Sequence, residues 1–344
     1  MSSQYLRRFS FLINFTLWPL TSHPIGYSAL PHQANTMPIL STIQTSRPNT
    51  SQLIVGENTP SSEQSEKSEK QEAIAEIPEF APVMEYAKNK NLATNSMTDT
   101  MQAIADYFLG TPYVANLLDG SSQEKLVIYL KGFDCVLFVE NVLAIARGIA
   151  SNDYSFSNFV QGIENLRYRD GQINGYCSRL HYFSDWIRDN EKRGVVVNIT
   201  EKLGGVRLDK RRDFMTNHRN SYPQLADQAN YQCLVNVEDQ LSQTAFSYIP
   251  TAEISNIYDQ LQPGDIIGVA TAIRGLDFTH TGLVYQLPNG NKGLIHASPV
   301  GEVVISRDLQ TYISRVESAI GIVVARPVDP RSLPIDHPVE QMLP

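Results

Sequence analysis

The sequence predicts an α+β fold, in which helices come first along the chain and an antiparallel sheet follows. The first observation is an almost wholly apolar helix that begins at Cys135, within the segment Lys131–Gly148 (KGFDCVLFVENVLAIARG). The second is a series of five short strand-like runs between residues 261 and 328, separated by tight turns. Short strands at close spacing are typical of an antiparallel meander, and helices that precede the sheet indicate α+β rather than alternating α/β.

The chain begins with the features of a secretory signal peptide. Arg7 and Arg8 precede the apolar run Phe9–Leu20, which is shorter than the ~20 residues needed to span a bilayer. We therefore interpret residues 1–30 as a signal peptide and predict export to the periplasm or cell envelope, with no stable membrane span. The alternative is a disordered or anchoring N-terminus.

Composition divides the rest of the chain into a tether, one domain and a tail. Residues 31–80 are rich in Ser, Thr, Gln, Pro and Glu, which favours a flexible acidic tether. One ordered domain is expected over residues 81–330, followed by a flexible tail over residues 331–344. The formal net charge is −8, and the absence of a basic stripe in the sequence excludes a nucleic-acid partner.

Order is expected to begin near Phe80, with a helix in the segment MTDTMQAIADYFLG. Its apolar residues fall on one helical face, with Thr98 or Asp99 as the N-cap and Gly110 as the stop. The run Glu124–Leu130 (EKLVIYL) is a candidate strand that leads into the cysteine turn. Residues 151–254 then form a largely helical insertion, which includes an amphipathic helix in HYFSDWIRDNEKRG.

Cys135 occupies the first turn of its helix, directly after Asp134, a good N-cap candidate. Unpaired backbone N–H groups and the positive end of the helix dipole stabilise a thiolate at this position. The helix is apolar on nearly every face, so it is predicted to be buried and to hold the sulfur rigidly. Cys135 is therefore a candidate nucleophile, and the alternative is a cysteine that serves packing alone.

Three cysteines make an odd count in a chain predicted to be exported. One thiol must then stay free or pair with another molecule. Cys177 and Cys233 either form a disulfide or remain buried thiols, and the sequence does not decide between the two.

Two histidines in the predicted sheet supply a base for the thiol. His280 opens HTGLVY and His296 lies in LIHAS, and a cysteine nucleophile needs an imidazole base and a third group that orients it. A two-residue turn at Asn289-Gly290 would put the histidines on opposite faces of the sheet. A loop of about five residues centred on Pro288 would put them directly opposite each other, and we predict this wider loop.

The same three residues suggest an alternative chemistry. Cys135, His280 and His296 could be three ligands of a zinc ion, with water as the fourth. The sequence has none of the short ligand pairs, such as C-x-x-C or H-x-x-x-H, that mark many zinc sites. We therefore favour the hydrolase without a metal.

Several motifs together resemble a known family. FDCVLFVENVLA, LQPGDI, HTGLVY and LIHAS resemble the NlpC-type papain-like cell-wall hydrolases. GTPYVANLLD and YRDGQINGYCSRLHYFSDWI extend the resemblance to one branch, the N-acetylmuramoyl-L-alanine amidase-like family, over roughly Met101–Pro327. The resemblance implies a papain-like NlpC-type fold, with the nucleophile-bearing buried helix packed on an antiparallel sheet.

The resemblance also implies roles for residues. Cys135 matches the nucleophile, His280 the general base and His296 the group that orients the base. The implied reaction is hydrolysis of the amide bond between N-acetylmuramic acid and L-alanine, with no metal or organic cofactor. Peptidoglycan fragments (muropeptides) would be the substrates.

Basic and aromatic residues around the cysteine are candidates for substrate binding. Arginines can pair with stem-peptide carboxylates and tyrosines can stack on sugar rings. The alternative is that those in SRLHYFSDWI belong to an ordinary amphipathic helix, and His181 in that segment is expected to be structural. The candidates are Arg167, Arg169, Arg179, Tyr168, Tyr176 and Tyr182 from the insertion, with Asp134 and, by resemblance, Tyr113.

The sequence thus favours an exported cysteine amidase and leaves three rivals. An endopeptidase of the same superfamily would cut within the stem peptide instead. A non-catalytic wall-binding module would bind muropeptides without turnover. A zinc hydrolase would lose activity to a chelator.

Overall fold

The computed structural model describes residues 75–332. The predicted signal peptide, the tether up to residue 74 and the tail from residue 333 lie outside these described residues. Near the end of these residues, the Arg331 guanidinium donates hydrogen bonds to the carbonyls of Ala93 and Asn95, both at 2.9 Å. Within residues 75–332, no helix combines the length and apolar character needed to cross a bilayer.

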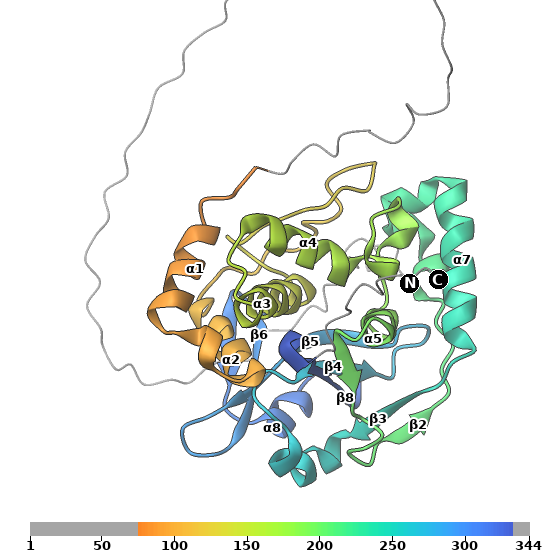
Figure 1. The fold of residues 1–344 in the computed structure, drawn as a ribbon. Helices are drawn as coiled ribbons and strands as arrows, with labels where there is room; N and C mark the ends of the chain where they lie inside the picture. The colour runs from red at the N-terminus through yellow and green to blue at the C-terminus, as the bar shows by residue number, and fades with distance from the viewer. Residues whose placement is uncertain (1–74, 333–344) are drawn as a thin grey trace, which may run out of the picture. The chain divides into compact units, whose positions relative to one another are not determined.

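Helices cover an antiparallel sheet, which confirms a mixed helix and sheet fold (Figure 1). The sheet order is β2-β3-β8-β4-β5-β6-β7, and β1 also pairs with β8. The helices are α1 (Phe80–Asn89), α2 (Met97–Tyr107), α3 (Cys135–Ala150), α4 (Phe156–Arg167), α5 (Phe183–Lys192), α6 (Phe214–Asn217), α7 (Gln228–Ser242) and α8 (Leu309–Ile313). The strands are β1 (Val196–Asn198), β2 (Val206–Leu208), β3 (Phe246–Pro250), β4 (Ile266–Thr271), β5 (Phe278–Gln286), β6 (Lys292–Ala297), β7 (Val303–Ser306) and β8 (Ala319–Pro327).

Helix α3 lies at the centre of the main core, as its apolar sequence predicted. Phe138 and Val142 are fully buried and share a core with Leu283 of β5 and Ile295 of β6. The Asp134 side chain caps the helix by accepting hydrogen bonds from the next free backbone N–H groups. Both the burial and the cap of this helix are confirmed.

The five predicted strand runs are all strands, but the last one has a different neighbour. Strands β4 to β7 form the expected meander, whereas β8 returns to pair with β4 on its other side. Strands β1, β2 and β3 of the insertion extend the sheet beyond β8. These strands, of three to five residues, were not predicted because runs this short show little alternation between apolar and polar residues. Their presence means that the insertion is helical only in part.

Two local predictions upstream of α3 are wrong. Residues 124–130 form no strand. Side chains, not a neighbouring strand, donate hydrogen bonds to backbone carbonyls of that segment. Arg167 donates to Val127 O at 2.7 Å, and the Tyr168 hydroxyl donates to Lys125 O at 3.2 Å. The N-cap of α2 is Ser96 rather than Thr98 or Asp99, since its hydroxyl accepts the Asp99 N–H.

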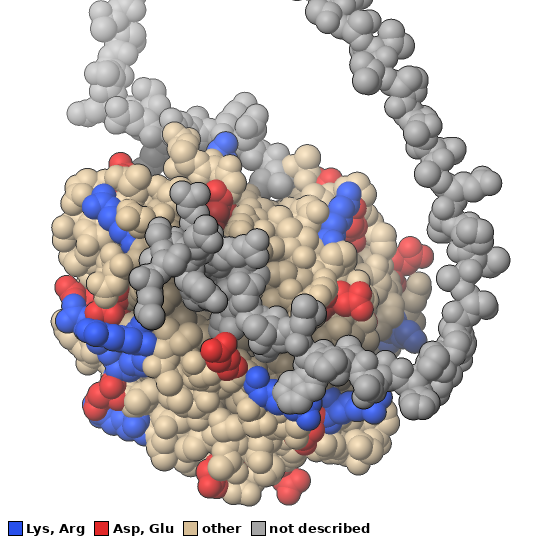
Figure 2. All heavy atoms as spheres, turned by 180° about the vertical axis from the view of Figure 1, so that it is seen from behind, with Lys and Arg blue, Asp and Glu red and all other residues tan. Residues whose placement is uncertain are grey.

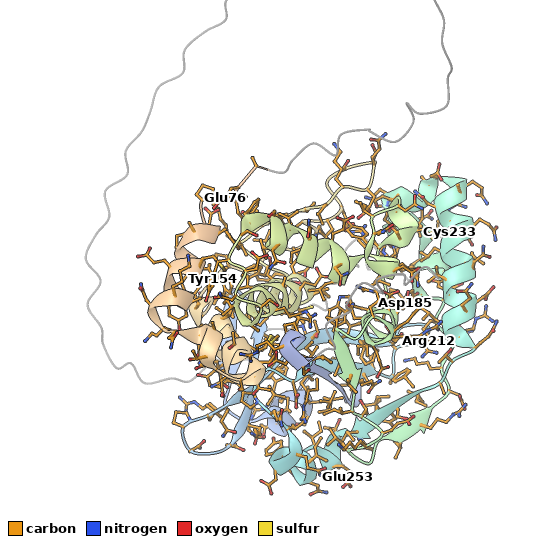
Figure 3. All side chains as sticks on the ribbon, in the orientation of Figure 1. Glu76, Tyr154, Asp185, Arg212, Cys233 and Glu253 are labelled. Atoms are coloured by element: carbon orange, nitrogen blue, oxygen red, sulfur yellow. A yellow bond between two sulfur atoms is a disulfide. The ribbon has the colours of Figure 1, made fainter. Side chains whose placement is uncertain are left out.

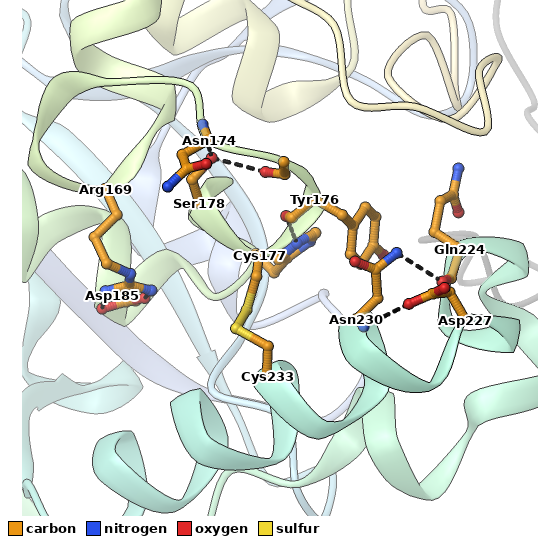
Figure 4. Close-up of a disulfide and its surroundings, with 12 residues drawn as sticks. Arg169, Asn174, Tyr176, Cys177, Ser178, Asp185, Gln224, Asp227, Asn230 and Cys233 are labelled. Carbon is orange, nitrogen blue, oxygen red and sulfur yellow. Dashed lines mark hydrogen bonds and ion pairs between the residues drawn. A yellow bond between two sulfur atoms is a disulfide. The ribbon is translucent and has the colours of Figure 1, made fainter. Parts of the chain in front are cut away.

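Cys177 and Cys233 form a disulfide, which decides the question that the sequence left open. The bond ties the short helix η4 (Tyr176–Ser178) to α7 (Figure 4). Around it lies a separate small core made of Tyr176, Tyr182, Met215, Leu225, Leu234 and Leu241. The third cysteine, Cys135, keeps a free thiol.

Replacing both bonded cysteines, Cys177→Ser with Cys233→Ser, should lower the free energy of unfolding by about 2–4 kcal/mol. The bond joins positions 56 residues apart, so its loss frees a long loop in the unfolded chain. Urea unfolding followed by tryptophan fluorescence measures the change. A reductant should reproduce the loss in the wild type and leave the double variant unchanged; a wild type indifferent to reductant would contradict the prediction.

Candidate active site

A five-residue loop joins the two strands that carry the histidines. Pairing of β5 with β6 reaches Gln286↔Lys292, so the loop spans residues 287–291. The predicted wide loop is confirmed, but its centre is Asn289 rather than Pro288. The two histidines therefore stay on one face as diagonal neighbours and do not lie directly opposite each other.

Gly282 gives the two imidazole rings room to meet. The register, continued by one pair, sets Gly282 opposite His296. A Cβ on Gly282 would lie 2.9 Å from the Cβ of His296, closer than real Cβ contacts. Because residue 282 is glycine, the space between the diagonal neighbours His280 and His296 stays open. Nε2 of His280 lies 2.8 Å from Nδ1 of His296.

Burial keeps both imidazoles neutral. His280 is 8% exposed and His296 is 2% exposed. Burial and the neighbouring ring lower the pKa of His280 well below 6.5. Burial lowers the pKa of His296 to about 4, although a hydrogen bond with the backbone of Ala297 opposes the shift. At neutral pH the contact between the rings is therefore a hydrogen bond with one N–H.

Cys135 approaches this pair from the start of α3. It is the first residue of the helix and is 6% exposed. The backbone N–H of Thr281, which follows His280 directly in β5, lowers the pKa of the thiol, against the larger rise that burial causes. Helix α3, which begins at Cys135, packs against β5 and β6, the strands that carry His280 and His296. Among the described residues, no hydrogen bond joins the thiol to either imidazole.

The thiol is protonated at neutral pH, contrary to the thiolate expected from its place on the helix. Burial, followed by the Asp134 carboxylate, raises the pKa of Cys135 to about 12, although backbone N–H groups oppose the shift. The helix start has less effect than expected because the N–H groups of Val136 and Leu137 already bind Asp134 at 2.9 and 2.8 Å. Burial also raises the pKa of Asp134 to about 6.

A pocket of about 130 Å³ adjoins Cys135 on the side of the insertion. Apolar side chains such as Leu118, Leu180 and Met215 form part of its lining. Five of the predicted substrate-binding residues also line it: Tyr113, Asp134, Arg167, Tyr176 and Arg179.

The two arginines of this pocket are already paired with carboxylates of the protein. Nε of Arg167 lies 2.8 Å from Oε2 of Glu140, and both side chains are almost fully buried. Nη2 of Arg179 lies 3.1 Å from Asp119, and its Nε lies 3.4 Å from Glu124. These side chains shape the pocket wall. The sequence analysis expected them to pair with a substrate carboxylate, but neither arginine presents an uncompensated positive charge.

The other candidates from the insertion do not line this pocket. Tyr168 is fully buried and Tyr182 is 2% exposed, and each hydroxyl donates to a glutamate. Their predicted stacking on sugars is wrong because both rings fill the interior. Arg169 pairs with Asp185 of α5 (Figure 4). His181 lines the pocket and binds a backbone carbonyl, in keeping with a structural role.

Tyr312 of α8 is a neighbour of the histidines that the sequence analysis missed. Its ring centroid lies 4.7 Å from that of His296 and 6.3 Å from that of His280. Helix α8 packs on Leu294 of β6, and His296, two residues later, faces the same side. Strand β7 ends at Ser306, earlier than the predicted strand run. In the sequence, the one sign of the five-residue helix α8 that follows is the Asp that caps its start.

The donor geometry fits a hydrogen-bonded histidine pair better than a shared zinc ion. Two imidazole nitrogens on one tetrahedral zinc would lie about 3.3 Å apart, whereas Nε2 of His280 and Nδ1 of His296 lie 2.8 Å apart. Among the described residues, no three His, Cys, Asp or Glu side chains are grouped so that they could hold a metal ion.

Comparison with protein families identifies the domain. A model of the N-acetylmuramoyl-L-alanine amidase-like family matches residues 103–322. The chain belongs to this family. Membership in the amidase-like family supports a hydrolase that acts on peptidoglycan, at the level of the family. A search of curated proteins gives no match.

Solved structures resemble this amidase-like domain. An N-acetylmuramoyl-L-alanine amidase from Bacteroides uniformis is 32% identical, over 67% of this chain and 98% of that chain, with a TM-score of 0.64. A putative xylanase from Bacteroides fragilis is also 32% identical, over 64% and 98% of the two chains, with a TM-score of 0.58. A protein from Legionella pneumophila, 23% identical over 73% and 94%, shares the fold with a TM-score of 0.55.

Replacing Asp134 by Asn should speed alkylation of Cys135 by iodoacetamide. Asn still caps the helix, but the charge that raises the thiol pKa is gone, and each pKa unit changes the thiolate fraction about tenfold. In both proteins the rate should rise with pH, because the thiolate is the reactive form. Mass spectrometry at several pH values gives the rates.

Asp227→Asn is the matched control, since Asp227 caps α7 in the same manner. It should react like the wild type. Equal rates for Asp134→Asn and the wild type would show that the carboxylate does not set the thiol pKa.

Replacing Tyr312 by Leu should raise the pKa of His296 from about 4 toward its ordinary value of about 6.5. The lost ring would admit water to the buried imidazole, and hydration favours the charged form. NMR titration of the histidine ring protons measures the shift. Tyr312→Phe keeps the ring and should stay near the wild type; a rise of the same size in the Phe variant would assign the effect to the hydroxyl instead.

Proposed function

We propose that this chain hydrolyses the amide bond between N-acetylmuramic acid and L-alanine in peptidoglycan fragments. Cys135 is the nucleophile, His280 is the general base and His296 orients the base. One observation carries the proposal: Nε2 of His280 lies 2.8 Å from Nδ1 of His296, on two strands that pack against the helix that begins at Cys135. A thiol, a base and an orienting group form the set that a cysteine hydrolase requires.

The hydrogen bond between the histidines assigns a role to each nitrogen. Nε2 of His280 is occupied by Nδ1 of His296, whereas Nδ1 of His280 makes no hydrogen bond to any described residue. Nδ1 is therefore the atom that takes the thiol proton. His280 then carries a proton on Nε2 and donates it to His296, which fixes the tautomer needed for the base.

The pKa shifts favour attack by a thiol that loses its proton as it reacts. Burial raises the pKa of Cys135 and lowers that of His280, so the resting pair is neutral at pH 7. Sγ of Cys135 bonds to the amide carbon as its proton moves to Nδ1 of His280. The imidazolium then protonates the leaving amine of L-alanine, and water activated by His280 hydrolyses the thioester.

Backbone N–H groups at the start of α3 are suited to the oxyanion of the intermediate. The N–H groups of Val136 and Leu137 bind Asp134, which leaves the N–H of Cys135 as the donor for the oxyanion in this turn. In the pocket beside the thiol, Tyr113, Asp134 and Tyr176 would contact the substrate. Arg167 and Arg179 would support the wall through their own ion pairs.

The remaining parts of the proposal concern fold and location. The buried helix on an antiparallel sheet, with its first-turn cysteine, supports a papain-like NlpC-type fold. The leader supports export to the periplasm or cell envelope, and the disulfide between Cys177 and Cys233 suits an oxidising compartment. No metal or organic cofactor takes part in the proposed steps.

Mass spectrometry of purified muropeptides tests the function. The wild type should release free stem peptide and intact disaccharide, with or without a chelator. Cys135→Ala should abolish the release, because the covalent intermediate needs the thiol. Cys177→Ser with Cys233→Ser serves as a control for the loss of cysteine as such and should retain turnover.

Other outcomes support the rival functions. Products cut within the stem peptide would assign an endopeptidase, and loss of activity with the chelator would assign a zinc hydrolase. Binding of muropeptides without turnover in any variant would assign a wall-binding module.

A further inference from the structure

Arg212 differs from the other buried arginines of the domain. Residues 75–332 contain three arginines that are at most 7% exposed: Arg167, Arg179 and Arg212. The first two are paired with carboxylates. Arg212 is 2% exposed, yet no described carboxylate lies within 4.0 Å of its guanidinium. The buried carboxyl of Asp277 acts on this charge from beyond 4.0 Å, so no residue of this part of the chain makes a direct ion pair with the guanidinium.

The protein fixes one edge of the Arg212 guanidinium and leaves the other unused. Nη1 donates to the carbonyls of Lys210, Leu241 and Thr244 at 2.7–2.8 Å. The ring of Phe246 packs against the guanidinium, with 5.0 Å between its centroid and Cζ. Within the described residues, neither Nε nor Nη2 has a hydrogen-bond partner. These two donors form the edge that holds both oxygens of a carboxylate.

Arg212 lines a cavity of about 310 Å³ between α5, β3 and the end of α7. Figure 3 shows Arg212 in this region, between α5 and α7. The volume falls at the lower end of the roughly 300–1,000 Å³ of small-molecule sites. Its lining shares no residue with that of the pocket beside Cys135. Six of the lining residues are Arg188, Glu191, Arg212, Thr244, Ala245 and Phe246.

Charges around this cavity are arranged by depth. Arg212 is buried, whereas Arg188, Glu191 and Glu201 are exposed. The two glutamates are held in place, since Glu191 accepts the N–H of Asn198 at 2.8 Å and Glu201 accepts the Ser247 hydroxyl at 3.0 Å. The unused donor edge of Arg212 can thus bind an anionic group, and the exposed carboxylates favour an amine.

The opposite face of the domain shows no comparable concentration of one charge. On the described atoms in Figure 2, basic and acidic side chains alternate over the surface. The side chain of Arg212 therefore belongs to its cavity and not to a broad basic surface.

We propose that this cavity is a second binding site, for a small zwitterion of amino-acid or dipeptide size. The carboxylate of the ligand would bind Nε and Nη2 of Arg212, and its amine would face Glu191 and Glu201. The ring of Phe246 would hold the guanidinium in plane for a two-oxygen contact. This site is separate from Cys135 and does not depend on the proposed hydrolysis.

Calorimetry on the full chain carrying Cys135→Ala tests the site without turnover. The probes are the dipeptide alanylglutamate and, as a control without any carboxylate, alaninamide. The dipeptide should bind saturably with a Kd of about 1 mM or tighter, and alaninamide at least about tenfold more weakly. Arg212→Lys keeps the charge but loses the two-donor edge, so it should weaken dipeptide binding about tenfold.

A second variant tests the cavity without touching Arg212. Ala245→Phe should fill the space and abolish binding, even if Arg212→Lys proves poorly folded. Val300→Phe adds the same bulk at a position that is 78% exposed and lies away from the lining, so it should bind like the parent. Unchanged binding in Ala245→Phe, equal affinity for both probes, or no saturable binding would overturn the proposal. None of these outcomes bears on hydrolysis at Cys135.

Discussion

The part of the domain around the candidate active site depends on the ion pair between Arg167 and Glu140. Glu140 lies on α3 and also accepts the indole N–H of Trp186 from α5 at 3.2 Å. Arg167 ends α4 and donates to the Val127 carbonyl in the preceding loop. One buried pair therefore joins two helices, the cysteine helix and a loop. Removing one partner of such a pair leaves a buried charge, at a cost of roughly 3–5 kcal/mol, so the positions of these four segments are coupled.

Burial determines the chemistry of the thiol more than the helix dipole does. The first turn of a helix lowers a cysteine pKa in open surroundings, but here the Asp134 side chain already occupies two N–H groups and brings its own charge. The same burial lowers the histidine pKa values. Thiol and imidazole are thus both uncharged at rest, and a protonated thiol is less readily oxidised than a thiolate.

Sequence periodicity predicted the parts of the fold that rest on strong local signals. The apolar run after Cys135, the alternation in the sheet and the even spacing of the histidines gave α3, the strands and the shared face. The loop centre was wrong by one residue because turn chemistry near Pro288 allows several registers. Tyr312 had only the capping Asp of its five-residue helix as a cue. Arg212 had none, since it acquires its meaning from carbonyls far along the chain. Tyr168 was misplaced because an aromatic ring suits a core as well as a sugar.

The position of β8 has a consequence for the order of folding. This strand, residues 319–327, is the last of the chain, yet it lies between β3 and β4 and also pairs with β1. Strands from the insertion and strands of the meander are thus joined through a segment that leaves the ribosome after all of them. Pairing over such long separations is slow, and until it occurs β3 and β4 lack a shared neighbour. The sheet is therefore completed only after the last strand of the domain has been synthesised.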